Sequence, residues 1–107
     1  MPDHVEASRK LNDLVRASFL GCRIFVTAGI RGLDDPGAVL AKVRAFDAFS
    51  EDNDPHCEHD FGVLEHLGER IFWKIDYYDQ TLTGGSPDPS DPSITVRVLT
   101  VMLASEY

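Results

Sequence analysis

Two runs of alternating residues, joined by a short segment that contains glycine, constrain the fold more than any other feature of the chain. Residues 61–66 and 70–78 are rich in β-branched and aromatic side chains, and Leu67-Gly68-Glu69 separates them. Gly68 can adopt the positive φ that a tight hairpin turn requires. Alternation predicts a core face of Ile71, Trp73, Ile75 and Tyr77, and an opposite face of Phe72, Lys74, Asp76 and Tyr78.

Helical periodicity comes first along the chain. Residues 5–19 carry apolar side chains at the spacing of one buried helix face, namely Leu11, Leu14, Val15 and Phe19. Residues 23–28 predict a short strand, and the following Gly29-Ile30-Arg31-Gly32 is interpreted as a turn because it lacks the residues of a phosphate-binding loop. Asp34-Asp35-Pro36 supplies an N-cap and a first-turn proline for a helix over about 36–47.

A third helix is predicted after the proline-rich segment 83–92. Its buried stripe would consist of Ile94, Val98, Leu99, Met102 and Leu103. The predicted order is therefore α-β-α-β-β-α. We expect an α+β fold with one compact domain over residues 1–107, in which a small, three-stranded, mostly antiparallel sheet is packed by helices.

Composition points to a soluble globular protein. The chain has 107 residues, of which 43% are hydrophobic and 26% charged, and this size suffices for one core. No run of about 18 apolar residues could span a bilayer, and charged residues interrupt the first 20 positions, so we expect no membrane association and a cytoplasmic location. Cys22 and Cys57 are too few for a disulfide framework and are expected to remain thiols.

Charge is distributed unevenly along the chain. Residues 1–46 hold seven Lys or Arg against five Asp or Glu, whereas residues 47–107 hold three against thirteen. The net charges are therefore +2 and −10, which sum to the formal −8 of the whole chain. Such an acidic surface repels phosphate backbones, which disfavours direct binding of nucleic acid. A basic protein partner or a small cationic ligand fits better, although the same charge also serves solubility alone.

Several motifs resemble one family of short bacterial proteins. The most specific is Phe-Trp-Lys-Ile-Asp-Tyr-Tyr-Asp at 72–79, followed by Glu-His-Asp-Phe-Gly at 58–62, with further similarity at 11–14, 44–49, 52–55, 85–89 and 97–100. That family is catalogued only as a domain of unknown function, is common in alphaproteobacteria and occurs on plasmids and prophages. The resemblance implies an accessory protein of mobile elements or their hosts. His56 and Cys57 depart from the family pattern, which weakens a role for them as metal ligands.

The segment 52–60 is dense in carboxylates and imidazoles. Its candidate ligands for Mg²⁺, Mn²⁺ or Ca²⁺ are Asp52, Asp54, Glu58, His59 and Asp60. The spacing matches neither an EF-hand nor a zinc helix, and side chains of this kind also form turns by bonding nearby amides. We therefore favour a structural role over a metal site.

A second hypothesis concerns one end of the hairpin. A turn at Gly68-Glu69 would pair Lys74 with Val63, Asp76 with Phe61 and Tyr78 with His59. Such a register would gather His59, Asp60, Asp76 and Tyr78, which could bind a ligand or act as acid and base in a small enzyme, with Lys74 holding an anionic group. The simpler interpretation is a salt-linked polar surface.

Taken together, these observations favour a non-enzymatic binding module over a metal-dependent or acid/base enzyme. Its acidic C-terminal part would engage a basic protein partner or a small ligand. One specific version is an inhibitor of host defence that presents carboxylates as a nucleic acid presents phosphates. The sequence leaves the oligomeric state open, since a hairpin edge could pair with its twin but nothing requires it.

Overall fold

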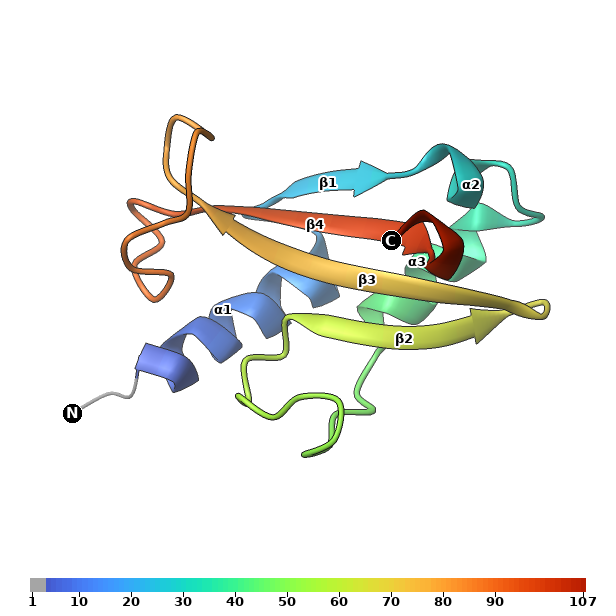
Figure 1. Ribbon diagram of the computed structural model, residues 1–107, viewed down its shortest axis with the longest axis horizontal. Coiled ribbons are helices and arrows are strands. Elements are labelled where there is room, and N and C mark those ends of the chain that lie inside the picture. The colour runs from blue at the N-terminus through green and yellow to red at the C-terminus, as the bar shows by residue number, and fades with distance from the viewer. Residues whose placement is uncertain (1–3) are drawn as a thin grey trace.

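The computed structural model describes residues 4–107 and contains a single four-stranded sheet (Figure 1). The helical elements are α1 (His4–Ser18), α2 (Ala28–Arg31), α3 (Pro36–Arg44) and the short 3-10 helix η1 (Ala104–Glu106). The strands are β1 (Arg23–Val26), β2 (Phe61–His66), β3 (Glu69–Tyr78) and β4 (Val96–Leu103). The sheet order is β1-β4-β3-β2, with β1 parallel to β4 and the other neighbours antiparallel. The α+β class is confirmed, whereas the three-stranded sheet and the predicted order of elements are wrong.

The hairpin of β2 and β3 is confirmed, but its register is not the predicted one. Leu67 and Gly68 both adopt positive φ, at 51° and 83°, and form a two-residue turn between the paired His66 and Glu69. Lys74 therefore lies opposite Phe61 rather than opposite Val63. The predicted turn residues are Gly68 and Glu69. Leu67 adopts a positive φ as well, so the turn residues are Leu67 and Gly68, one position earlier in the chain.

The predicted final helix is wrong, because the segment forms strand β4. This strand lies between β1 and β3 and pairs with both. Its side chains alternate, with Arg97, Leu99 and Val101 buried on the helix side. A central strand carries apolar residues on both faces, so the spacing of Val98, Leu99 and Met102 mimics that of a helix. Ser90 and Asp91, which precede this strand, belong to turns.

The core lies between one face of the sheet and the helices. The predicted core residues Ile71, Trp73 and Ile75 are buried, and Tyr77 packs against them. They contact apolar residues from the other elements, namely Val15, Ile30, Val39, Val43, Leu99 and Val101. The opposite face of the sheet is turned toward the viewer in Figure 1. Part of it is covered by Tyr107, whose ring lies 5.5 Å from that of Phe72 and 6.3 Å from that of Phe61.

Helix α1 buries a face that is mostly polar. Its buried residues are Ser8, Asn12, Val15 and Arg16, whereas Leu14 is 63% exposed. The predicted apolar stripe is therefore wrong at Leu14, although Val15 is part of the core. The reason is that polar groups of the sheet face α1 and require hydrogen-bonding partners, which leucine cannot supply.

The two remaining helices differ in how well the sequence predicts them. Asp35 caps α3 as predicted, because its carboxylate accepts from the Ala38 amide at 3.2 Å. The predicted turn at 29–32 is instead mostly the single helical turn α2. The Gly29 amide at its start is occupied by the Glu106 carboxylate at 3.2 Å. Within residues 4–107 no helix is long and apolar enough to cross a membrane.

Candidate functional site

The loop before β2 is held by the Asp54 carboxylate. Asp54 is buried, and its Oδ1 accepts from the backbone amides of Glu58 and His59 at 3.1 and 3.2 Å. Cys57 and His59 adopt positive φ within this turn. Asp52 is exposed on the outside of the loop. Asp54 therefore acts as a turn former, which is the structural interpretation that the sequence favours.

His59 fastens this loop to α1. Its Nδ1 lies 2.8 Å from Asp13 Oδ1, and its Nε2 lies 3.4 Å from Asp54 Oδ2. The imidazole stacks on the Phe49 ring, with centroids 3.7 Å apart. The Arg16 guanidinium lies over the Phe49 and Trp73 rings, 5.2 and 5.3 Å from their centroids. Arg16 also pairs with Asp13 at 3.0 Å. Because both ring nitrogens of His59 already face carboxylates, the imidazole has a positioning role at this junction.

Asn12 is the centre of a buried polar network between α1 and the sheet. Its Nδ2 donates to the Tyr77 hydroxyl at 2.7 Å and to the Glu58 carbonyl at 2.9 Å. Its Oδ1 accepts from Arg97 Nε at 2.7 Å. The Tyr77 hydroxyl in turn donates to the Glu58 carboxylate at 3.2 Å. Burial raises the pKa of Tyr77 to about 12, so the phenol remains a donor at neutral pH.

Arg97 is a buried cation bound by neutral oxygens. It is 3% exposed and donates to Ser8 Oγ at 3.0 Å and to the Pro89 carbonyl at 2.6 Å, in addition to Asn12. Its guanidinium lies 5.0 Å from the centre of the Tyr77 ring. Among the described residues no carboxylate forms an ion pair with it. Burial lowers the pKa of Arg97, and the hydrogen bonds are what compensate its lost hydration.

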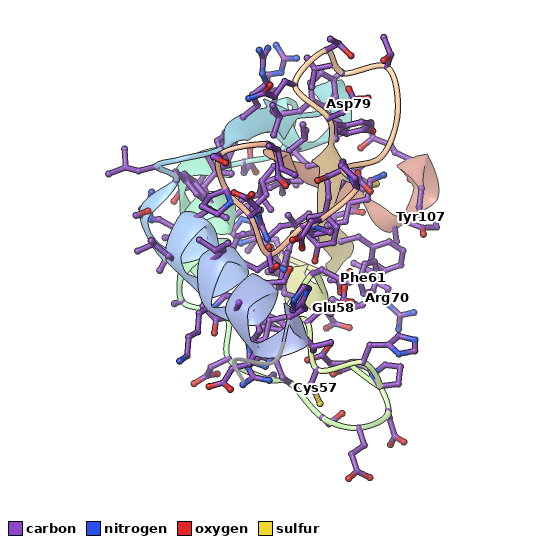
Figure 2. The ribbon with its side chains drawn as sticks, turned by 90° about the vertical axis from the view of Figure 1, so that its left-hand side faces the viewer. Cys57, Glu58, Phe61, Arg70, Asp79 and Tyr107 are labelled. Carbon is purple, nitrogen blue, oxygen red and sulfur yellow. The ribbon has the colours of Figure 1, made fainter. Side chains whose placement is uncertain are left out.

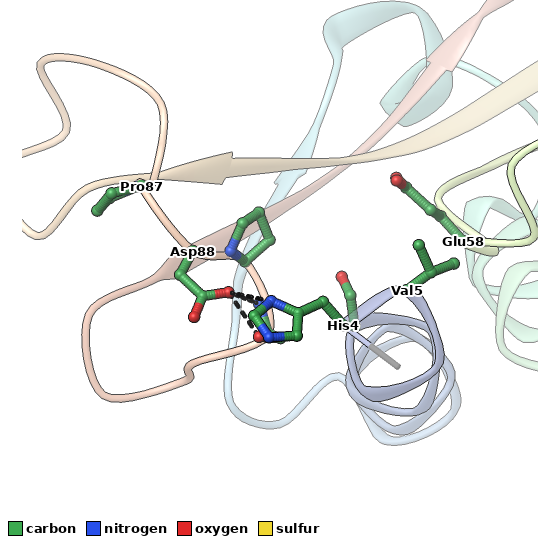
Figure 3. Close-up of a pocket in the computed structure, with 8 residues that line it drawn as sticks. His4, Val5, Glu58, Pro87 and Asp88 are labelled. Carbon is green, nitrogen blue, oxygen red and sulfur yellow. Dashed lines mark hydrogen bonds and ion pairs between the residues drawn. The ribbon is translucent and has the colours of Figure 1, made fainter. Parts of the chain in front are cut away.

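A shallow pocket of about 200 Å³ opens above this network. Figure 3 shows it between the start of α1 and the segment 87–90, with Glu58 on one side and Asp88 on the other. His4 Nδ1 lies 3.6 Å from Asp88 Oδ1 across its mouth. The other lining residues are Val5, Ser8, Pro87, Pro89 and Ser90. The pocket thus joins two loops that are about 30 residues apart in the sequence.

The two loops that meet here are strongly acidic. Segments 47–60 and 79–95 together contain nine Asp or Glu and no Lys or Arg. The carboxylates in the first segment are Asp47, Glu51, Asp52, Asp54, Glu58 and Asp60, and those in the second are Asp79, Asp88 and Asp91. We call this region the acidic end of the molecule. Its field attracts cations and repels anions.

Asp60 has the most perturbed carboxyl group of the acidic end. Burial raises its pKa to about 6, and repulsion from the Glu58 carboxylate contributes in the same direction. A raised pKa in an acid means that the folded state binds a proton more tightly than the unfolded state does. The protonation of Asp60 therefore contributes to the free energy of unfolding in a pH-dependent way.

We predict that the free energy of unfolding decreases as the pH rises from about 4 to about 6, because only the folded state still holds the Asp60 proton in that window. The cost should be about 1 kcal/mol, since solvent reaches part of this carboxylate and screens it. Urea titrations across this range measure the effect, and Asp60→Asn should remove that component of the pH dependence. Identical pH profiles for the wild type and the variant would contradict the assignment.

The remaining predicted site residues lie on the other side of the sheet. Lys74 Nζ and Asp76 Oδ2 form an ion pair at 2.9 Å, and Tyr78 follows on the same face. This is the salt-linked surface that the simpler interpretation predicts. In Figure 2, Glu58 lies beside α1, whereas Tyr107, which packs on the face that carries Phe72 and Lys74, lies on the opposite side. The structure therefore does not bring His59 and Asp60 together with Asp76 and Tyr78.

Several residues of the network and pocket were not anticipated from the sequence, among them Asn12, Asp88 and Arg97. The spacing of Ser8, Asn12 and Arg16 at i, i+4 and i+8 could have revealed Asn12, because it places three polar side chains on one helix face. Asp88 and Arg97 have no comparable signal in their neighbouring residues. Among the described residues, no group of three or more His, Cys, Asp and Glu side chains is arranged to hold a metal ion.

Comparison with known proteins identifies a family for most of the chain. A family model described as "Protein of unknown function (DUF3768)" matches residues 26–106. The match spans all of the strands except the first three residues of β1, and it excludes α1. No curated protein and no solved structure matches the chain.

Proposed function

The chain belongs to this family of proteins of unknown function, and we propose that it is a non-enzymatic binding module whose acidic end engages a basic segment of a partner protein. The observation that carries the proposal is the meeting of two acidic loops at the pocket. Glu58 and Asp88 stand on opposite sides of it. A lysine or arginine side chain entering there would lie near two carboxylates that come from different parts of the chain.

Electrostatics favours a cationic partner over other classes. The nine carboxylates of the two loops have no Lys or Arg within the same segments to neutralise them. Fields of this kind accelerate association with oppositely charged partners and discriminate against like-charged ones. The buried cation Arg97 is enclosed by α1 and the segment that contains Pro89. Arg97 therefore organises the pocket from within rather than presenting its charge to a partner.

The arrangement of side chains supports a binding role better than the acid/base enzyme. General acid/base catalysis requires its groups within hydrogen-bonding reach of one substrate. His59 contacts Asp13 of α1, and Asp60 lies opposite the core residue Ile75, whereas Asp76 and Tyr78 belong to the other face of the sheet. The sheet itself separates the two pairs, so one substrate cannot contact all four residues.

We expect the protein to bind a short fluorescent peptide in which lysine and valine alternate, and to bind it less tightly as sodium chloride is raised toward about 0.5 M. Removing two charges with Glu58→Gln and Asp88→Asn should weaken binding about tenfold at low salt, since each exposed charge pair contributes up to about 1 kcal/mol. Both substitutions keep an oxygen that can accept the bonds from Tyr77 and Ser90. Fluorescence anisotropy measures the dissociation constant.

The matched control removes the same charge at the other end of the molecule. Asp34 and Glu69 are exposed and lie beside the turn of the hairpin, where the Asp34 carbonyl contacts His66 at 3.1 Å. Compared at the same salt concentration, Asp34→Asn with Glu69→Gln should leave the affinity within about twofold, because the Coulomb energy falls with distance and these carboxylates lie at the far end of β2 from Glu58. Equal losses in the two double variants, or affinity that does not depend on salt, would overturn the proposal.

A further inference from the structure

We propose that the basic partner binds as an added β-strand along the free edge of β2. This inference rests on the proposed function and names the mode of binding. Extended segments commonly bind to exposed sheet edges, where main-chain hydrogen bonds supply affinity and side chains supply specificity. The sheet has two edges, β1 and β2, and the following contacts distinguish them.

The pairing of β2 with β3 shows which backbone groups point outward. The amide of Ile75 donates to the Asp60 carbonyl at 2.8 Å, which marks these opposite residues as a hydrogen-bonded pair. Because such pairs alternate along an antiparallel ladder, Gly62, Leu64 and His66 also bond to β3. Phe61, Val63 and Glu65 are the intervening residues, and their N–H and C=O groups point away from β3.

A side-chain contact confirms that the Glu65 carbonyl points away from β3, and it shortens the part of the β2 edge that is free to pair. Lys42 Nζ donates to the Glu65 carbonyl at 3.1 Å, so this outward carbonyl is already occupied. Within residues 4–107 the outward amides and carbonyls of Phe61 and Val63 have no such cover. Four backbone groups on two alternate residues are therefore presented in the geometry that an incoming strand requires.

The β1 edge is less suitable. The amide of Thr27 bonds to the Val101 carbonyl, so Ile24 and Val26 are the outward residues of this four-residue strand. Arg31 Nε donates to the Val26 carbonyl at 3.1 Å and covers the end of the edge. Both edges have cations nearby, Arg23 and Arg31 beside β1 and Lys42 beside β2, but β2 is directly preceded by the acidic segment 47–60. A cationic partner therefore fits β2 better.

Side chains beside the β2 edge match a segment that alternates between apolar and basic residues. Val63 is 41% exposed on the open face and pairs with Phe72, whose ring lies 5.3 Å from that of Phe61. An apolar side chain of an added strand would extend this cluster. The acidic segment 47–60 immediately precedes β2 and supplies carboxylates for lysine or arginine. A second copy of the chain is disfavoured, because in an antiparallel pair centred on Val63 the Glu65 of each copy would lie opposite Phe61 of the other, next to the acidic segment 47–60.

The test uses the alternating lysine–valine peptide and two substitutions at one position. Val63→Pro removes the outward amide but no bond to β3, and an edge strand tolerates proline there. Val63→Ala trims the side chain and keeps the amide. We expect Val63→Pro to weaken binding at least about tenfold and Val63→Ala to weaken it about twofold. The same peptide carrying N-methyl groups on alternate residues should lose affinity for the wild type, and this arm stands even if Val63→Pro fails to fold.

The outcomes separate this inference from the proposed function. If the wild type binds in a salt-dependent manner and the Glu58/Asp88 variant loses binding, but Val63→Pro and the N-methylated peptide bind normally, the added strand is wrong and the acidic site stands. If the peptide does not bind at all, both proposals fail. If sedimentation shows a dimer that Val63→Pro dissociates, a second copy occupies the edge and the inference is overturned.

Discussion

Replacing Asn12 by alanine is expected to lower the free energy of unfolding by about 3 kcal/mol. The substitution removes the acceptor for Arg97 Nε and the donor to the Tyr77 hydroxyl and the Glu58 carbonyl. Arg97 would then remain buried with one of its hydrogen bonds unmade, and a buried cation that loses a partner is among the most costly defects in a fold. Urea titration followed by the fluorescence of Trp73, the single tryptophan, measures the change.

Leu14→Ala supplies the matched control on the same helix. By periodicity alone Leu14 belongs to the core, yet it is 63% exposed. Its truncation should therefore cost less than about 0.5 kcal/mol, as is usual for surface substitutions. If Leu14→Ala proved as costly as Asn12→Ala, α1 would be held by apolar contacts and the polar network would have only a minor role.

The parts of the fold that the sequence predicts correctly are those that depend on neighbours in the chain. The alternation of β3 is visible locally, and so are the glycine in the hairpin turn and the Asp35 cap of α3. In each case the residues that determine the structure are within about four positions of one another. Local chemistry is therefore sufficient to predict them.

The errors arise where distant residues decide the structure. Strand β4 is inserted between β1 and β3, so both of its faces carry apolar residues and its pattern loses the period of two. The buried face of α1 is polar because Arg97, 85 residues away, bonds to Asn12. No window along the sequence contains both residues. The helix face could not be assigned without the sheet that it covers.

The candidate site shows the same division. The turn-forming role of Asp54 follows from residues only four and five positions later, and the structure agrees with it. The predicted cluster of His59, Asp60, Asp76 and Tyr78 required a particular hairpin register. It also required that the loop before β2 direct its side chains toward β3. Asp76 and Tyr78 belong to the face away from the helices, whereas His59 turns back toward Asp13 of α1. The pocket between Glu58 and Asp88 required two loops to meet, which sequence spacing does not reveal.

Trp73 lies close to the backbone of β2 at Gly62. Substituting Gly62 is therefore the second change expected to lower the free energy of unfolding strongly. A Cβ atom built on Gly62 would collide with Trp73 Nε1 and would lie 2.6 Å from Trp73 Cε2 and 2.8 Å from Phe46 Cζ. Trp73 is fully buried, and Phe46 and Phe49 meet its ring edge-on at 5.4 and 6.1 Å, so the indole has little freedom to move away. Gly62→Ala should therefore cost about 3 kcal/mol, at the upper end of the range for overpacked cores.

A double-mutant cycle tests this cause directly. Trp73→Leu should itself cost about 3 kcal/mol because it replaces a fully buried indole by a smaller side chain and leaves a cavity. It also vacates the space that the Gly62→Ala methyl group needs, so the two costs together should fall at least 1 kcal/mol below their sum. Gly84→Ala is the control, because a Cβ there meets only Asp79 Oδ2, at 3.6 Å, and should change stability by less than about 0.5 kcal/mol. Additive costs for Gly62→Ala and Trp73→Leu would mean that Gly62 is needed for a reason other than contact with the indole.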